Sequence, residues 1–259
     1  MMNKHRKRKF GAGRIGSMET SLEKLVFILM YMKCYPTFDL IGFYFDMWGS
    51  TACRNMHFLL NVLEKTLGRN MSLPKRRIST PQEFEELFPG ITDVFMDGSE
   101  RRVQKPRVLK RRNKLYSGKK KATTRKGVVV TDVHKRILLL TPTKSGRRHD
   151  KRIADKNMSA RSFPENVTVW VDTGFQGFNK LHQNTMIPKK RSRKTPLTIV
   201  EKEDNKLISQ IRVVAEHAIG GMKRFKAATD IYRNRRENID DHLSLVSAGL
   251  WNYHLLYRA

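Results

Sequence analysis

The sequence is poor in acidic residues and in cysteine. Its 259 residues include 24 Asp and Glu against 52 Lys and Arg, so the formal net charge is +28. A chain this basic repels itself unless a polyanion neutralises it, which makes nucleic acid the leading partner. The two cysteines, Cys34 and Cys53, cannot form a disulfide framework and match no zinc-ligand spacing. A reducing compartment is therefore expected.

The sequence also lacks long apolar runs. The longest stretch, residues 25–32, falls far short of the roughly 20 apolar residues that a spanning helix needs. The N-terminal residues MMNKHRKRKF lack the apolar region of a signal peptide. Hydrophobic residues still make up 39% of the chain and recur periodically, which excludes a wholly disordered protein. We expect one or two folded domains and no membrane association.

The positive charge is concentrated in two runs. Residues 101–150 hold 18 Lys and Arg but only two acids, Asp132 and Asp150, and a second cluster occupies residues 189–194. A single run of this kind is usually a solvated loop, whereas two runs inside a folded domain favour a phosphate-binding channel. Such contacts provide affinity and position rather than sequence choice.

A small helical domain is predicted for residues 17–68, after a basic flexible tail over residues 1–16. The spacing of apolar residues predicts a helix over residues 19–35. Thr37 can cap a second, short helix, and Ser50 can cap a third helix that ends near Leu67.

Two helices joined by a short turn form the pattern of a helix-turn-helix. The second of them would present Arg54 and Asn55 outward, and these are side chains suited to guanine and adenine edges. The alternative is a three-helix module for packing or dimerisation, which would show the same pattern.

Residues 69–90 are rich in proline and glycine and are predicted as a linker with one short helix over residues 81–88. The domain that follows, residues 91–259, changes from helical periodicity to short β runs over residues 94–96, 128–130, 137–140 and 167–171. Two helices, over residues 205–225 and 240–257, close the chain. Strands followed by helices indicate a mixed α/β or α+β fold.

Three acids stand out in this domain. Asp97 and Asp172 each end a predicted strand, and a glycine (Gly98 and Gly174) follows where the chain is expected to turn. Glu216 lies on a predicted helix and shares a face with Arg212 and Lys223. For any single acid the alternative is a turn residue or an ion pair between Arg212 and Glu216. As a set, the three carboxylates offer hard oxygen ligands for two divalent cations that act on a phosphodiester.

Four segments together resemble a known family. They are the helix-turn-helix, the Phe95-Met96-Asp97-Gly98 strand, the central block of Tyr116 to Lys121 with His149-Asp150-Lys151, and the Trp170-Val171-Asp172-Thr173-Gly174 motif. In addition, the Arg212, Glu216 and Lys223 spacing fits the family's helical signature. The chain resembles the DDE transposases of bacterial insertion sequences, in the family-five group.

The resemblance implies an RNase H-like catalytic domain, a mixed sheet flanked by helices, behind the helix-turn-helix. It implies that Asp97, Asp172 and Glu216 are catalytic and bind Mg²⁺ or Mn²⁺, with two ions in the site. Arg212 and Lys223 are implied to contact DNA near the cut, and Lys119, Lys120 and Lys121 are also expected to bind DNA. Asp150 we interpret as structural or as supporting the ligands, because it precedes a predicted helix rather than ending a strand.

The activity implied is hydrolysis at the element's ends and transfer of the freed 3′-hydroxyl into target DNA. The implied partners are double-stranded DNA, as terminal inverted repeats and as target, and further copies of the chain in a dimer or higher oligomer. The place implied is the nucleoid in the bacterial cytoplasm. Two auxiliary positions depart from the family: Ser209 stands in place of a tyrosine and Thr123 in place of a histidine.

Two other functions compete with this one. A DNA-binding relic or regulator would keep the helix-turn-helix and the basic surface but need no metal. An RNA-binding protein of ribosomal type would explain the charge, but it would not explain acids at strand ends or the Arg, Glu and Lys on one helix face.

Overall fold

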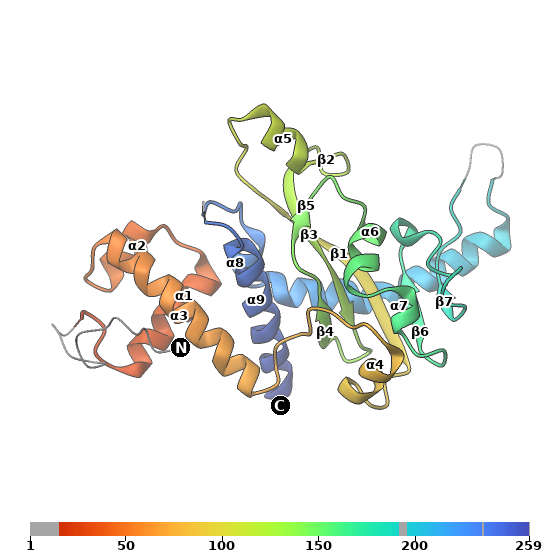
Figure 1. The fold of residues 1–259 in the computed structure, drawn as a ribbon, viewed down its shortest axis with the longest axis horizontal. Coiled ribbons are helices and arrows are strands. Elements are labelled where there is room, and N and C mark those ends of the chain that lie inside the picture. Colours follow the sequence, from red (N-terminus) through yellow and green to blue (C-terminus); the bar gives the residue numbers. More distant parts are fainter. Residues whose placement is uncertain (1–15, 192–195, 235, 259) are drawn as a thin grey trace.

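The computed structural model describes residues 16–191, 196–234 and 236–258, so almost all of the predicted basic tail and residues 192–194 of the second cluster lie outside the described residues. Three N-terminal helices lie to one side of a mixed sheet, and the C-terminal helix lies between them and the sheet (Figure 1). The predicted fold class, a helical helix-turn-helix region followed by a mixed sheet flanked by helices, is confirmed.

The N-terminal helices are α1 (Ser21–Cys34), α2 (Phe38–Tyr44) and α3 (Gly49–Arg69). Helix α1 begins later than predicted because Thr20 forms a capping box with Glu23, each side chain accepting from the other's backbone N–H. The predicted cap Ser50 is wrong, since α3 already begins at Gly49. The missing Cβ of Gly49 leaves room for the Asp39 carboxylate of α2, and so the two helices meet closely at their turn.

The N-terminal helices have no core of their own. The buried stripe of α3, which includes Met56, Leu60 and Leu63, packs against α1 and also against Leu243 and Val246 of α9 (Ile239–Leu256). Both parts of the chain therefore fold around one shared apolar cluster.

The segment expected as a linker is also packed. Lys75 exchanges backbone hydrogen bonds with β4 (Ile137–Leu140), donating to Leu138 O at 2.8 Å and accepting from Leu140 N at 2.9 Å. Helix α4 (Pro81–Leu87) buries Phe84 in the core beneath the sheet. This segment is consequently tied to the sheet along much of its length.

The sheet is mixed and is centred on one long strand. The strands are β1 (Asp93–Arg102), β2 (Tyr116–Ser117), β3 (Ala122–Thr131), β4, β5 (Lys144–Ser145), β6 (Thr168–Val171) and β7 (Thr185–Met186). The order is β2-β3-β1-β6-β7, and β4 and β5 also pair with β3. Strand β1 runs antiparallel to β3 and parallel to β6.

Helices cover both faces of the sheet. Successive side chains of β3 point to opposite faces, and apolar residues on both faces need to be covered. Val128 and Val130 face the cluster that includes α4 and α6 (Asp150–Asn157). Val129 faces the opposite cluster, where α7 (Ile199–Lys223) and α9 pack.

The remaining helices are α5 (Leu109–Leu115), which projects at the end of the β1–β2 connection, α8 (Lys226–Thr229), and the short turns η1 (Ala160–Ser162) and η2 (Thr173–Phe175) (Figure 1). None of the helices in the described ranges is long and apolar enough to cross a membrane.

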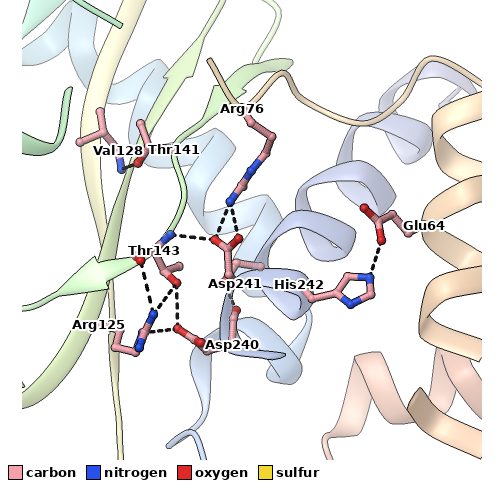
Figure 2. A network of polar contacts seen from close by, with 10 residues as sticks. Glu64, Arg76, Arg125, Val128, Thr141, Thr143, Asp240, Asp241 and His242 are labelled. Atoms are coloured by element: carbon pink, nitrogen blue, oxygen red, sulfur yellow. Dashed lines mark hydrogen bonds and ion pairs between the residues drawn. The ribbon is translucent and has the colours of Figure 1, made fainter. Parts of the chain in front are cut away.

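A polar network fastens α9 to its surroundings (Figure 2). Arg76 donates to both carboxylate oxygens of Asp241 at 2.5 Å, and Asp240 pairs with Arg125 of β3 at 2.5 Å. Next to Asp241 along α9, His242 Nε2 lies 2.7 Å from the Glu64 carboxylate of α3. Three consecutive residues of α9 thereby hold the 69–90 segment, the sheet and the N-terminal helices together.

Candidate active site and nucleic-acid interface

The prediction that Asp97 ends a strand is wrong: it lies in the middle of β1, which continues to Arg102. Gly98 is not a turn but a strand residue, paired with Val128 of β3. A Cβ at Gly98 would lie 3.2 Å from the carboxyl carbon of Asp150, so the glycine makes room for a side chain of α6.

Asp172 directly follows β6, as predicted. Strands β1 and β6 are parallel, and Met96 is in register with Val171, so Asp97 and Asp172 occupy neighbouring positions on adjacent strands. The Gly174 N–H donates to Asp172 Oδ1 at 2.8 Å, which orients this carboxylate at the start of η2. The sheet therefore brings two of the three predicted acids together.

The surroundings of Asp97 work against its negative charge. Burial raises the pKa of Asp97, and the nearby charge of Asp172 raises it further. The Gly98 N–H, which donates to Oδ1 at 2.7 Å, lowers the pKa, as do Arg212 and Lys119. A partly desolvated pair of carboxylates is a place where a divalent cation is favourable.

Arg212 reaches this pair from α7. Its Nη2 lies 3.8 Å from Asp97 Oδ1, and the residue is only 9% exposed. Arg212 is therefore buried, although Glu216, on the same predicted helix face, is exposed. The alternative of an ion pair between Arg212 and Glu216 is not what the structure shows, since Arg212 pairs with Asp97.

Glu216 lies about one helical turn beyond Arg212, exposed to solvent. Within the described ranges it forms no ion pair, and no three His, Cys, Asp or Glu side chains there stand close enough together to hold a metal ion. The donor chemistry nonetheless fits a divalent cation, because Asp97 and Asp172 are adjacent hard oxygen ligands and α7 carries a third carboxylate on the neighbouring turn.

Some of the predicted DNA-contacting lysines lie near Asp97. Lys119, Lys120 and Lys121 form the exposed turn between β2 and β3. Lys119 is near enough to lower the pKa of Asp97. Lys223 is half-buried at the end of α7; its burial and the nearby Lys120 lower its pKa, which Asp97 and Glu100 partly restore. The structure thus places Lys119 and Lys223 near Asp97, and Lys120 near Lys223.

The two residues of α3 predicted to read bases, Arg54 and Asn55, differ in exposure to solvent. Arg54 is exposed, and its guanidinium donates to Thr51 one turn earlier. Asn55 is half-buried, and its side-chain N–H contacts the Met47 sulfur at 3.3 Å. The expectation that both point outward therefore holds for Arg54 and is wrong for Asn55, which packs against the turn.

The two residues that depart from the family's pattern, Thr123 and Ser209, form hydrogen bonds away from the acids. Thr123 is buried and donates to Val103 O at 3.0 Å, and Ser209 is exposed and donates to Asn205 O at 2.8 Å. Both hydroxyl groups are satisfied by their own backbone surroundings.

Two basic cavities adjoin α5, which buries none of its residues. One, of about 730 Å³, lies between the β1–α5 connection and residues 232–238; its basic lining residues are Lys105, Arg107, Arg111, Arg125, Arg233 and Arg236. The other, of about 430 Å³, is lined by Lys114, Ser145, Arg147, Arg148, His149 and Arg152, with no acid among them. Residues 233–236 were missed by the sequence reasoning, although the run of arginines there was a visible signal.

Comparisons with known proteins agree with this geometry. The family model described as "DDE superfamily endonuclease" matches residues 96–252, and the model described as "Helix-turn-helix of DDE superfamily endonuclease" matches residues 17–69. The chain belongs to the DDE superfamily of endonucleases.

One curated relative matches most of the chain. The "Probable transposase for insertion sequence element IS702" of Microchaete diplosiphon is 28% identical over 237 residues, covering 92% of this chain and 82% of the relative. No solved structure matches the chain significantly.

Proposed function

We propose that this protein is the transposase of an insertion sequence and that it cuts DNA at the element's ends and joins the freed 3′-hydroxyl to target DNA. The observation that carries the proposal is that Asp97 and Asp172 each come one residue after Met96 and Val171, which are in register on parallel strands, with Arg212 buried near Asp97. The membership of the chain in the DDE endonucleases and its likeness to a probable transposase support it.

In this proposal Asp97, Asp172 and Glu216 hold one or two Mg²⁺ or Mn²⁺ ions. A divalent cation in such a site activates water or a 3′-hydroxyl and stabilises the leaving oxygen of a phosphodiester. Burial raises the pKa of Asp97, and the charge of Arg212 opposes this effect, which favours the carboxylate form that can act as a ligand. Glu216 comes from a helix rather than from the sheet, and we propose that it completes the ligand set when DNA is bound.

The basic residues then bind and orient the substrate. Lys119, Lys120, Lys121 and Lys223 face the phosphodiester next to the acids, and the cavities beside α5 bind backbone further along the duplex. The helix-turn-helix, residues 17–68, holds the element's end through Arg54, while residues 91–259 carry the chemistry. Because two ends must be joined, we propose a dimer or higher oligomer that works at the bacterial nucleoid.

The test is a nicking assay on a plasmid that carries the element's own termini, with Mn²⁺ present. Glu216→Gln and Asp97→Asn should each reduce cleavage by more than about 100-fold, the upper range for residues that merely support a ligand. Both variants should bind the terminal DNA as the parent does. The matched control is Asp155→Asn, an exposed acid of α6 whose ion-pair partner among the described residues is Lys151; this variant should cut normally.

The second candidate is a DNA-binding relic or regulator. The exposed position of Glu216, away from the two aspartates, is the observation that favours it. Salt-sensitive binding of cognate ends, with no cleavage by the parent in Mg²⁺ or Mn²⁺, would establish this candidate and reject the enzyme.

A further inference from the structure

Helix α1 is apolar on two opposite sides, but only one side is buried. The buried side packs into the cluster shared with α3 and α9 and consists of Phe27, Ile28, Tyr31 and Met32. The opposite side, called here the outer face of α1, carries four apolar residues at the spacing of one helix face: Leu22, Leu25, Val26 and Leu29. The first three are 68%, 44% and 48% exposed, and Leu29 is half-buried. Because a helix that is apolar all round is normally covered all round, the outer face is expected to have a partner.

The outer face lies on a nearly neutral helix of a strongly basic protein. Helix α1 contains one acid, Glu23, and two lysines, Lys24 and Lys33, whereas the whole chain has a net charge of +28. A surface that binds DNA needs an excess of positive charge. Two copies of a basic chain repel each other, and they do so least where their surfaces are apolar and neutral. The outer face therefore suits a second copy of this chain better than it suits DNA.

The charged residues of α1 complement those of an antiparallel copy. Glu23 lies in the first turn and Lys33 in the last turn, and both are exposed. A twofold axis near the middle of α1 places Glu23 of each copy near Lys33 of the other, with Val26 opposite Leu29 between the two ion pairs. The apolar residues would thus meet at the centre of the contact, with the charged residues at its edge.

Both charged groups can take part in such a pair. The hydrogen bonds that Glu23 accepts at the start of α1 use Oε2, from the backbone N–H groups of Glu19 and Thr20 and from the Thr20 hydroxyl, so Oε1 can accept from a lysine. Lys33 Nζ lies 5.8 Å from the centre of the Phe225 ring, a contact that leaves its N–H groups able to donate to a carboxylate.

We propose that the outer face of α1 is a dimer interface, formed with α1 of a second copy in antiparallel orientation. This inference rests on the proposed function, which requires at least two copies of the chain, and it names the surface that joins them. Because α1 shares an apolar cluster with α3 and α9, a dimer formed through α1 also fixes the two helix-turn-helices and the two catalytic domains relative to each other.

The test is sedimentation velocity of the full-length protein over a range of concentrations, after nuclease treatment and without DNA or metal ions. The parent should form a dimer. Leu22→Gln combined with Val26→Gln should raise the dissociation constant at least about 10-fold, since each change enters a twofold interface twice. Glutamine favours a helix about as well as leucine and better than valine, so circular dichroism should show a folded variant.

The matched control changes the same two residue types on another helix. Val200→Gln combined with Leu207→Gln replaces an exposed valine and an exposed leucine of α7 and should leave the dissociation constant unchanged.

A charge reversal tests the antiparallel orientation. Lys33→Glu should weaken the dimer, because it places a second acid near Glu23 of the other copy. Adding Glu23→Gln should restore part of the affinity, because it removes this repulsion while glutamine still serves in the capping box. If the second change restores nothing, the antiparallel arrangement is overturned.

The other outcomes separate this inference from the proposed function. A parent that stays monomeric at every concentration overturns the inference, and so does parent-like association of the folded α1 variant or equal weakening by the α7 control. If the parent cuts cognate ends but its association does not depend on α1, this inference alone fails. If dimers depend on α1 but the parent cuts no cognate end, the proposed function fails and the interface stands.

Discussion

Two consecutive glycines of α7 should respond in opposite ways to the same substitution. A Cβ at Gly221 would lie within 3.0 Å of three carbons of the Trp251 indole, a separation that real Cβ atoms essentially never show. Trp251 cannot easily move, because it is buried and its Nε1 donates to Lys135 O at 2.9 Å. At Gly220 no atom lies within 4 Å of the added carbon.

The magnitudes follow from these surroundings. Overpacking of a tight core costs about 1–3 kcal/mol, and the change from glycine to alanine in a helix returns about 1 kcal/mol. Contacts this short with a fixed ring belong at the upper end of the overpacking range, so Gly221→Ala should destabilise the protein by about 2 kcal/mol. Gly220→Ala should stabilise it by about 1 kcal/mol.

Urea unfolding monitored by circular dichroism measures both free energies, and melting gives an independent check. For a chain of this size each kcal/mol moves Tm by about 2–4 °C, so the two variants should melt on opposite sides of the parent. If both raise Tm, the contact between Gly221 of α7 and Trp251 of α9 is looser than the Cβ distances indicate. If both lower it, the solvent-exposed position of Gly220 is wrong.

Three further substitutions test other parts of the structure. Arg76→Ala should cost about 1–3 kcal/mol in urea unfolding, since it leaves the partly buried Asp241 carboxylate without its cationic partner; a cost near zero would contradict the network of Figure 2. Burial raises the pKa of Asp132, so its ionisation destabilises the fold as pH rises above its ordinary value of about 4. Asp132→Asn should therefore be more stable than the parent at pH 7, with an advantage that shrinks toward pH 4, and a constant difference would contradict this. Arg111→Ala should lower the slope of log K against log salt for DNA binding by about 0.9, while exposed Lys206→Ala on α7 should leave it unchanged.

Much of the fold could be predicted from periodicity alone. The apolar run over residues 137–140 is observed as a strand with those bounds, and the strand before Asp172 ends where predicted. Both segments are short and buried, and a buried strand of this kind carries its own signal in continuous apolar residues.

The error at Gly98 has a different physical origin. A glycine after an acid usually marks a turn, but this one is a strand residue whose missing side chain accommodates Asp150 from a distant helix. Similarly, helical spacing placed Arg212 on a common face with Glu216, but only the packing of α7 on the sheet shows that Arg212 is buried against Asp97. Local patterns predict elements well, whereas the partners of a residue depend on tertiary contacts that they do not contain.

The apolar cluster shared by α3 and α9 affects how this protein can evolve. Leu243 and Val246 of α9 contact the same core as Met56 and Leu60 of α3, so neither half can be exchanged for a homologous half without leaving mismatched surfaces. A shortened chain that lacks the first three helices would expose this face of α9 and tend to aggregate. New DNA specificity should therefore arise by substitution on the outer surface of α3 rather than by replacing the helix-turn-helix as a module.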